Sequence, residues 1–219
     1  MEIDLLKYEK ELYEKGYELI AGTDEVGRGP LVGPVVAAAV ILPKNYELKG
    51  LTDSKKLNEK KRNIFYDIIQ NDAISVGVGI VSEDVIDQIN ILEASRLAMN
   101  IALDNLKVKP DYILSDAMKL DRDVEVLPII HGDAQSITIA AASVIAKVTR
   151  DRMMEDLGKM YPEYEFERHK GYPTKRHIEL VKQYGVLKEY RKTFKPINEL
   201  VKESGVRNEQ EETKEKIKQ

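Results

Sequence analysis

The 219-residue sequence contains no cysteine. Without cysteine there is neither a disulfide framework nor a thiolate metal site, and this agrees with a reducing compartment. Histidine is also scarce, with three residues in the whole chain, and these form no metal-ligand pattern. Any metal site in this protein is therefore expected to use oxygen ligands.

Long apolar runs are missing as well. The longest, VVAAAVIL at 35–42, is far shorter than the roughly 18 residues that a membrane-spanning helix needs. The chain begins with MEIDLLKYEKELYEK, which is acidic and lacks the basic start and apolar centre of a signal peptide. The sequence thus predicts a soluble, cytoplasmic protein with no membrane partner.

A net positive charge is absent too, since 34 basic and 38 acidic residues give a net charge of −4. The positive charge is nevertheless clustered. SKKLNEKKR at 54–62 holds five basic residues and one acidic residue, and ERHKGYPTKRH at 167–177 holds four and one. Such clusters are compatible with phosphate binding, although a solvated surface is their usual explanation.

The hydrophobic fraction of 42% is enough for one large globular domain. Patterns of apolar residues predict five strands, at 17–23, 34–42, 73–81, 111–117 and 124–133. They predict helices within 1–15 and at 58–71, 82–106, 136–157, 174–184 and 197–204. On the helix at 58–71, Ile64, Ile68 and their neighbours are expected to supply the apolar face.

The order of these elements predicts an α/β fold with a mixed sheet. The first two strands are joined by a short, glycine-rich connection and are expected to form an antiparallel hairpin. Later strands alternate with helices, which is typical of parallel neighbours covered on both faces. We expect a helical N-terminal extension at 1–16, one domain at 17–204 and a disordered polar tail at 205–219.

Acidic residues follow three of the predicted strands: Asp24 and Glu25, then Asp116, then Asp133. If the first and fourth strands are neighbours, these side chains meet at one end of the sheet. Neighbouring residues of a regular strand point to opposite faces, so the pair can share a site only if the strand breaks there. Any one of these acids could instead be an ordinary turn-former or helix cap.

Carboxylates about 4 Å apart repel each other by roughly 4 kcal/mol at an effective dielectric constant near 20. Either some of them are protonated or a cation lies between them. An all-oxygen ligand set favours Mg²⁺ or Mn²⁺ over Zn²⁺. Two such ions would activate a water and stabilise the leaving oxygen in phosphodiester hydrolysis.

Several blocks of the sequence closely resemble the bacterial type 2 ribonuclease H (ribonuclease HII) family. They are DEVGRGPLVGPVVAAAV, LTDSKKL, SDA, HGDAQSITIAAASVIAKVTRDRMM and HKGYPTKRH, in order between about residues 17 and 190. The resemblance implies a ribonuclease H-like fold, with a mixed five-stranded sheet between helices and a C-terminal helical segment. It also implies hydrolysis of the RNA strand of RNA–DNA hybrids and nicking of DNA 5′ to an embedded ribonucleotide. The products would carry 3′-hydroxyl and 5′-phosphate ends.

The resemblance assigns roles residue by residue. Asp24, Glu25, Asp116 and Asp133 match the metal-binding catalytic carboxylates of the family, and two divalent ions are implied. Gly27, Arg28 and Gly29 match a loop that recognises the ribose 2′-hydroxyl and nearby phosphates, while Tyr172 matches a tyrosine that stacks on the next sugar. Lys55, Lys56 and Lys170 are expected to hold the substrate backbone. Pro173 stands where glycine is common in the family.

Lys147 lies roughly 21 Å along its helix from the start near Asp133, too far for direct chemistry, and is expected to meet DNA or an internal acid. The tail lacks the paired aromatics of a sliding-clamp peptide, so we expect no clamp contact through it, and we expect a monomer.

Two other functions, a non-catalytic hybrid binder and a nucleotide-binding protein, fit these residues less well than a nuclease does. A non-catalytic binder of hybrids would gain nothing from four carboxylates beside phosphate. A P-loop or dinucleotide-binding protein is disfavoured because GTDEVGRG matches neither glycine motif.

Overall fold

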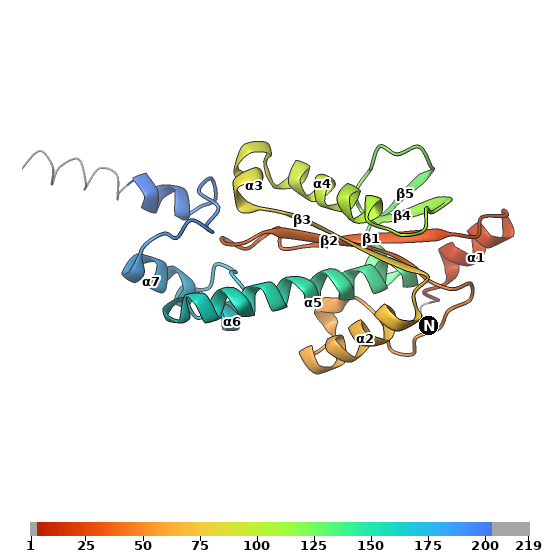
Figure 1. Ribbon diagram of the computed structural model, residues 1–219, viewed down its shortest axis with the longest axis horizontal. Coiled ribbons are helices and arrows are strands. Elements are labelled where there is room, and N and C mark those ends of the chain that lie inside the picture. Colours follow the sequence, from red (N-terminus) through yellow and green to blue (C-terminus); the bar gives the residue numbers. More distant parts are fainter. Residues whose placement is uncertain (1–3, 203–219) are drawn as a thin grey trace, which may run out of the picture.

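The computed structural model describes residues 4–202, which form a central sheet with helices on both faces (Figure 1). Five strands lie in the order β3-β2-β1-β4-β5. They are β1 (Ile20–Val26), β2 (Val35–Ile41), β3 (Ser75–Val81), β4 (Tyr112–Asp116) and β5 (Val126–Ile129). β1 pairs antiparallel with β2 and parallel with β4, as the glycine-rich connection and the alternating pattern predict. The mixed five-stranded sheet is confirmed.

Seven labelled helices and three short 3-10 turns join the strands. The helices are α1 (Lys7–Glu14), α2 (Glu59–Asp72), α3 (Glu83–Ile89), α4 (Ile91–Asp104), α5 (Ile137–Met160), α6 (Phe166–His169) and α7 (Lys175–Tyr184). The turns are η1 (Ser54–Lys56), η2 (Gly132–Ala134) and η3 (Pro162–Tyr164). Residues 197–202 are helical as well. Among residues 4–202, no helix has the length and apolar character that crossing a bilayer requires.

The sheet lies between two helical layers, with α3 and α4 above it and α5 and α2 below it in Figure 1. β2 is buried on both faces because its side chains alternate between the layers. Val36, Ala38 and Val40 belong to the core on the α5 side, and Ala37 and its neighbours to the core on the α4 side. The sheet therefore holds α4 and α5 in fixed positions at either face.

The glycines of β3 explain how α4 packs so closely on the sheet. A Cβ atom added to Gly79 would lie 2.0 Å from the carbonyl oxygen of Ala98 in α4. Close approach of another backbone is a usual reason for glycine inside a strand.

The first strand differs from the prediction in a way that matters for the site. β1 covers residues 20–26 instead of 17–23, and it runs through the acidic pair without a break. Asp24 stays opposite Ala38 and Glu25 opposite Ala37 in the antiparallel ladder with β2. The predicted break is wrong because this pairing continues beyond the two carboxylates. A break is also not needed for the two to share a site, because Asp116 at the end of β4 raises the pKa of both Asp24 and Glu25.

Two smaller predictions are also wrong. The helix expected at 82–106 is two helices, because Asn90 has a positive φ of 68° and its side chain caps α4 by accepting from Leu92 and Glu93. On α2 the apolar face lies where it was expected: Phe65 and Ile69 are buried and Ile68 packs against the core, although Ile64 is 50% exposed. The fifth strand is shorter than expected, at Val126–Ile129.

At the two ends of the chain, α1 confirms the helix expected in the first 15 residues, and its Leu12 is buried against the sheet. The tail at 205–219, for which we expect disorder, lies outside the described residues. The division into an extension at 1–16 and a domain at 17–204 stays a prediction.

Candidate active site

The acidic pair lies at the carboxyl end of β1. Strand alternation turns Asp24 and Glu25 to opposite faces of β1, and the hydroxyl of Ser143 on α5 opposes part of the rise in the pKa of Asp24. Asp24 is 4% exposed, and the Glu25 side chain is 8% exposed. Oδ1 of Asp24 accepts from the backbone N–H of Glu25 at 2.7 Å, and Oε1 of Glu25 lies 3.3 Å from Nη1 of Arg28.

The other two carboxylates reach the same end of the sheet from β4 and from the turn before α5. Asp116 is the last residue of β4, the parallel neighbour of β1. Its Oδ1 accepts from the backbone N–H of Gly132 at 2.7 Å. Asp133 follows in η2 and is buried. Long-range pairing of β1 with β4 therefore brings together acids that are more than 90 positions apart in the sequence.

A cleft of about 320 Å³ opens beside these carboxylates. Ten residues line it: Glu25, Val26, Gly27, Arg28, Gly29, Lys55, Asp116, Lys147, Arg150 and Tyr172. Seven of them are site residues predicted from the sequence. Asp24 and Asp133 are not among the lining residues, and both are buried.

The carboxylates perturb one another strongly. Burial, followed by repulsion from Glu25 and Asp116, raises the pKa of Asp24 well above its usual value. Burial also raises the pKa of Glu25 to about 7, although Arg28 opposes this, and it raises the pKa of Asp133 to about 6 with help from Asp53 and Asp116. The site concentrates more negative charge than its own side chains neutralise, as an oxygen-ligand cation site does.

Lys55 is a second cation, besides Arg28, that lines the cleft beside this charge. Burial alone would lower the pKa of Lys55, but the carboxylates of Asp24, Asp53 and Asp133 outweigh burial and raise the pKa. The turn η1 that carries Lys55 is held on α5 by the hydroxyls of Ser54 and Ser143, 2.8 Å apart.

The glycine–arginine–glycine loop (residues 27–29) faces Tyr172 across the cleft. A Cβ atom at Gly29 would lie 3.5 Å from the ring of Tyr172, so the ring lies directly against the loop. The backbone N–H of Leu31 donates to Gly171 at 2.8 Å and joins the two segments. The ring of Tyr172 is 41% exposed and presents a free face.

The comparisons with known proteins agree with this geometry. A family model described as Ribonuclease HII matches residues 21–198. Ribonuclease HII of Bacillus cytotoxicus is 57% identical over 200 residues, which cover 91% of this chain and 77% of the relative. Ribonuclease HII of Bacillus anthracis is also 57% identical over 200 residues, covering 91% of this chain and 78% of the relative. The chain belongs to the ribonuclease HII family.

Membership of the ribonuclease HII family makes the chain a type 2 ribonuclease H, an endoribonuclease that cleaves the RNA of RNA–DNA hybrids. Solved structures agree. Ribonuclease H2 of Pyrococcus horikoshii has a TM-score of 0.72 and 28% identity, covering 83% of this chain and 96% of that chain. Bst-RNase HIII in complex with Mn²⁺ has a TM-score of 0.61, 18% identity and coverage of 84% and 70%, and supports the ribonuclease H-like fold alone.

Two buried arginines that sequence reasoning missed hold the loops of this ribonuclease HII site. Arg150 of α5 donates to the carbonyl oxygens of Val32, Pro34 and Lys170, at 2.9 to 3.1 Å. Gly27 has a φ of +92°, and a Cβ atom there would lie 2.3 Å from Nε of Arg150. Arg150 lies within the quoted motif HGDAQSITIAAASVIAKVTRDRMM, but nothing local indicates that it reaches these carbonyls.

The second arginine, Arg191, is fully buried and donates to four carbonyl oxygens of one loop. The acceptors are Gly27 at 2.6 Å, Pro30 at 2.9 Å, Arg28 at 3.1 Å and Gly33 at 2.8 and 3.0 Å. Burial, followed by repulsion from Arg150, lowers the pKa of Arg191 to about 9, so the guanidinium stays charged at neutral pH. Arg191 lies about 160 residues from the loop it holds.

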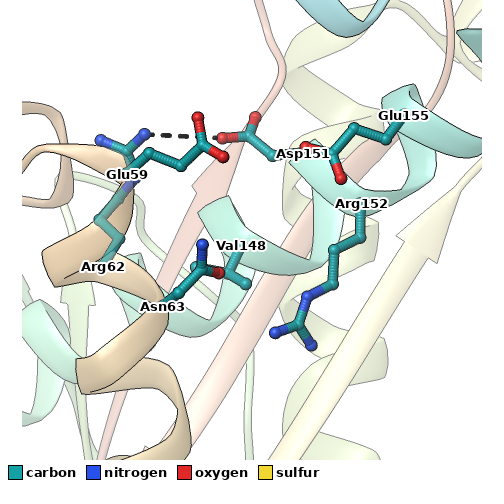
Figure 2. Close-up of a pocket in the computed structure, with 7 residues that line it drawn as sticks. All are labelled: Glu59, Arg62, Asn63, Val148, Asp151, Arg152 and Glu155. Carbon is teal, nitrogen blue, oxygen red and sulfur yellow. Dashed lines mark ion pairs between the residues drawn. The ribbon is translucent and has the colours of Figure 1, made fainter.

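Lys147 meets an internal acid, one of the two partners predicted for it. Its Nζ lies 2.6 Å from Oδ1 of Asp151, and Asp151 also pairs with Arg62 at 3.8 Å. Figure 2 shows this second pair in a hollow of about 190 Å³ between α2 and α5. Arg62 also donates to the carbonyl oxygens of Ser54 and Leu57, and so links α5 to the turn that carries Lys55.

The other predicted lysines lie apart from the cleft lining. Nζ of Lys170 donates to Glu155 at 2.7 Å, and its carbonyl accepts from Arg150. Lys56 is exposed on η1. Their roles as substrate contacts stay predictions.

Two stacked histidines support the segment that carries Tyr172. The rings of His169 and His177 are 4.0 Å apart at their centroids. Nδ1 of His169 accepts from the backbone N–H of Gly171, and Nδ1 of His177 donates to the carbonyl of Tyr172 at 2.8 Å. Burial lowers the pKa of His177 to about 4, so it is neutral at physiological pH. The ring of His169 packs against Phe166 and His177, so this histidine has a packing role.

The donor set suits divalent cations, although the side chains are not arranged around one. In residues 4–202, no three acidic or histidine side chains already form a metal-binding group. Asp24 and Asp116 each turn one oxygen to a backbone N–H, and Glu25 turns one to Arg28. Oε2 of Glu25 is buried with no hydrogen-bond partner. An open carboxylate oxygen among buried, mutually repelling acids fits a cation, with side-chain rotation on binding.

Proposed function

We propose that the chain nicks duplex DNA on the 5′ side of a single embedded ribonucleotide, besides cleaving RNA in hybrids. Hydrolysis would use two divalent ions, Mn²⁺ or Mg²⁺, and leave 3′-hydroxyl and 5′-phosphate ends. The observation that carries the proposal is the single cleft in which Glu25, Asp116, the glycine–arginine–glycine loop and Tyr172 meet.

Asp24, Glu25, Asp116 and Asp133 are proposed to hold the ions. Bound ions would polarise the scissile phosphate and lower the pKa of an attacking water. The carboxylates also direct the substrate, because they repel a phosphate that arrives without cations. Arg28 is paired with Glu25 before substrate binds. When Glu25 binds a metal ion, the guanidinium of Arg28 can turn to a phosphate of the substrate.

The loop at 27–29 is proposed to recognise the ribose. Glycines let the backbone approach a sugar closely, and the 2′-hydroxyl is the group that distinguishes RNA from DNA. Arg150 and Arg191 hold the carbonyls around this loop, so its shape exists before substrate arrives. A preformed loop loses little conformational entropy on binding.

Tyr172 is proposed to stack on the sugar that follows the ribonucleotide. Tyr172 is 41% exposed and offers the face of a flat ring. A Cβ atom built on Gly29 would lie 3.5 Å from this ring, which is the distance of van der Waals contact. A deoxyribose fits such a face, whereas a 2′-hydroxyl would crowd it. This arrangement favours an RNA-to-DNA junction over continuous RNA.

Lys55, which lines the cleft, is proposed as a backbone contact together with Lys56 and Lys170. We also propose that the protein is a monomer and is located in the cytoplasm.

One solved structure is titled a PCNA:RNase HII complex from Archaeoglobus fulgidus. It has a TM-score of 0.69 and 26% identity, and the match covers 81% of this chain and 95% of that chain. The tail in which we found no clamp peptide lies outside the described residues, so the absence of a clamp contact stays a prediction.

The direct test is a DNA duplex with one ribonucleotide, incubated with Mn²⁺ or Mg²⁺. We expect a single nick 5′ to the ribose that is abolished by chelator, with end groups determined by phosphatase treatment and ligation. An all-DNA duplex of the same sequence is the control and should stay intact. Binding without cleavage under either ion would favour a non-catalytic hybrid binder instead.

Tyr172→Ala is expected to slow junction cleavage about tenfold while slowing cleavage of a long hybrid less than threefold. The reason is that base or sugar stacking on an aromatic ring contributes about 1–3 kcal/mol, and 1.4 kcal/mol is a factor of ten. Single-turnover rates on the two substrates measure the ratio. Tyr184→Ala, which removes another exposed tyrosine ring, is the matched control. Equal losses on both substrates would contradict the stacking role.

A further inference from the structure

Glu9 of α1 is a fully buried carboxylate that the proposed reaction does not use. The family match begins at residue 21, so α1 lies outside it. The three hydrogen-bond donors to Oε1 of Glu9 come from the first turn of α5 and its cap. Oε1 accepts from the hydroxyl of Ser136 at 2.6 Å, the hydroxyl of Thr138 at 2.8 Å and the backbone N–H of Thr138 at 3.1 Å.

In this position the carboxylate of Glu9 supplements the N-terminal cap of α5, because it accepts the backbone N–H of Thr138. The first backbone N–H groups of a helix have no partner within it, and negative charge is favourable there. Ser136 caps α5 by accepting from Ile139, while it donates its own proton to Glu9. The Ser136 hydroxyl is thereby fixed in one orientation, and α1 is attached to the beginning of α5.

Hydrogen bonds continue from Ser136 into the candidate active site. The backbone N–H of Ser136 donates to the carbonyl of Gly132 at 2.8 Å, and that of Gly132 donates to Oδ1 of Asp116 at 2.7 Å. Asp133 lies between these two anchored residues, in η2. A second contact also fixes the turn, because the backbone N–H of Ile137 donates to Leu5 just before α1.

The cost of this arrangement argues against a role in stability alone. Oε2 of Glu9 is buried without a hydrogen-bond partner among the described residues. A buried carboxylate oxygen without a partner costs free energy that an apolar side chain would not. Burial accordingly raises the pKa of Glu9 despite three hydrogen bonds.

We propose that Glu9 is a positioning residue of the nuclease: through Ser136 and Gly132 it orients Asp133 and Asp116 for metal binding. This inference rests on the proposed function, in which these two carboxylates are metal ligands. The N-terminal segment, which the sequence suggested was an extension, thereby becomes part of the catalytic structure.

The test measures Mn²⁺ binding without substrate, by electron paramagnetic resonance of the free ion, together with kcat and KM. Residues that orient metal ligands typically contribute ten- to a hundredfold to metal affinity or activity. Glu9→Ala is therefore expected to weaken Mn²⁺ binding about tenfold and to lower kcat about tenfold, with KM within about twofold. Glu9→Gln keeps an acceptor oxygen for the three donors and should recover affinity to within about threefold of wild type. Glu11→Ala, on the exposed face of the same helix, should bind Mn²⁺ as wild type does.

Unchanged Mn²⁺ affinity and kcat in Glu9→Ala would overturn the inference, even if the thermal midpoint falls, since that result describes a purely structural contact. If Glu9→Ala does not fold, Glu9→Asp shortens the side chain and keeps the charge, and wild-type Mn²⁺ affinity in it would overturn the inference equally. Asp133→Asn separates the two proposals. If the wild-type protein cleaves the substrate and Asp133→Asn does not, the proposed function is supported, whatever the result for Glu9. If Asp133→Asn binds Mn²⁺ normally, the positioning role of Glu9 is overturned.

Discussion

Asp24→Asn is expected to slow cleavage at an embedded ribonucleotide by about a thousandfold or more, while leaving the fold intact. Metal-assisted stabilisation of a phosphoryl transition state contributes several kcal/mol, and each 1.4 kcal/mol is a factor of ten in rate. Asparagine keeps an oxygen that can accept the backbone N–H of Glu25, so the local geometry survives. What is lost is the charge that would hold the ion.

The same substitution is expected to raise the thermal midpoint when chelator is present. Burial and repulsion from Glu25 and Asp116 penalise the charged form of Asp24, as its raised pKa indicates. A neutral amide removes that penalty, so activity and stability should change in opposite directions, as is common at functional sites.

Single-turnover kinetics and thermal unfolding in chelator check both parts of this prediction. Asp67→Asn makes the same chemical change on the exposed face of α2 and should leave both measurements unchanged. Near-wild-type cleavage by Asp24→Asn would remove this residue from the site. A large fall in its thermal midpoint would show that Asp24 stabilises the fold instead.

Arg191→Ala is expected to lower the free energy of unfolding by about 3–5 kcal/mol and to slow cleavage about a hundredfold. Removing one side of a buried charged network leaves its partners unpaired, and such losses are typically of that size. Here the unpaired groups would be the carbonyl oxygens of Gly27, Arg28, Pro30 and Gly33. These carbonyls belong to the loop proposed to recognise the ribose.

Arg191→Lys should recover less than half of the lost stability. Lysine restores the charge, but its three donors diverge from one atom and cannot reach acceptors that a planar guanidinium reaches with its fork. Chemical denaturation gives the stabilities, and single-turnover rates at saturating enzyme give the activity. Lys192→Ala, at the exposed neighbouring position, is the control. A free energy of unfolding of Arg191→Ala equal to that of the wild type would refute the anchoring role.

Local patterns in the sequence were reliable where the physics is local. The helix predicted from residue 136 begins there, because the side chain of Ser136 caps α5 and satisfies a free N–H group of the same helix. The two strands joined by the glycine-rich connection form the predicted hairpin. The parallel pairing of β1 with β4, the condition for the acids to meet, is fulfilled in the structure. The resemblance then indicated which acidic residues to look for at the end of that sheet.

Local patterns failed where distant partners decide. The expected strand break at the acidic pair does not occur, because pairing with β2 holds Asp24 and Glu25 in a continuous strand. Within the predicted apolar face of α2, packing on α5 decides which side chains are buried: Phe65 and Ile69 are buried, whereas Ile64 is exposed. Asn90 divides the expected long helix because its side chain caps the second half.

The sequence by itself determined the family, the alternation of strands and helices, and the identity of the candidate carboxylates, because each of these depends on residues close together in the chain. Only the tertiary structure decided how the site is held. Arg150 reaches Pro34, Glu9 reaches Ser136 and Arg191 reaches Gly27, which lie 116, 127 and 164 positions away, and no spacing rule relates them. Hydrogen bonds of that kind form only after the sheet has brought the two segments into contact, so composition and periodicity carry no signal of them.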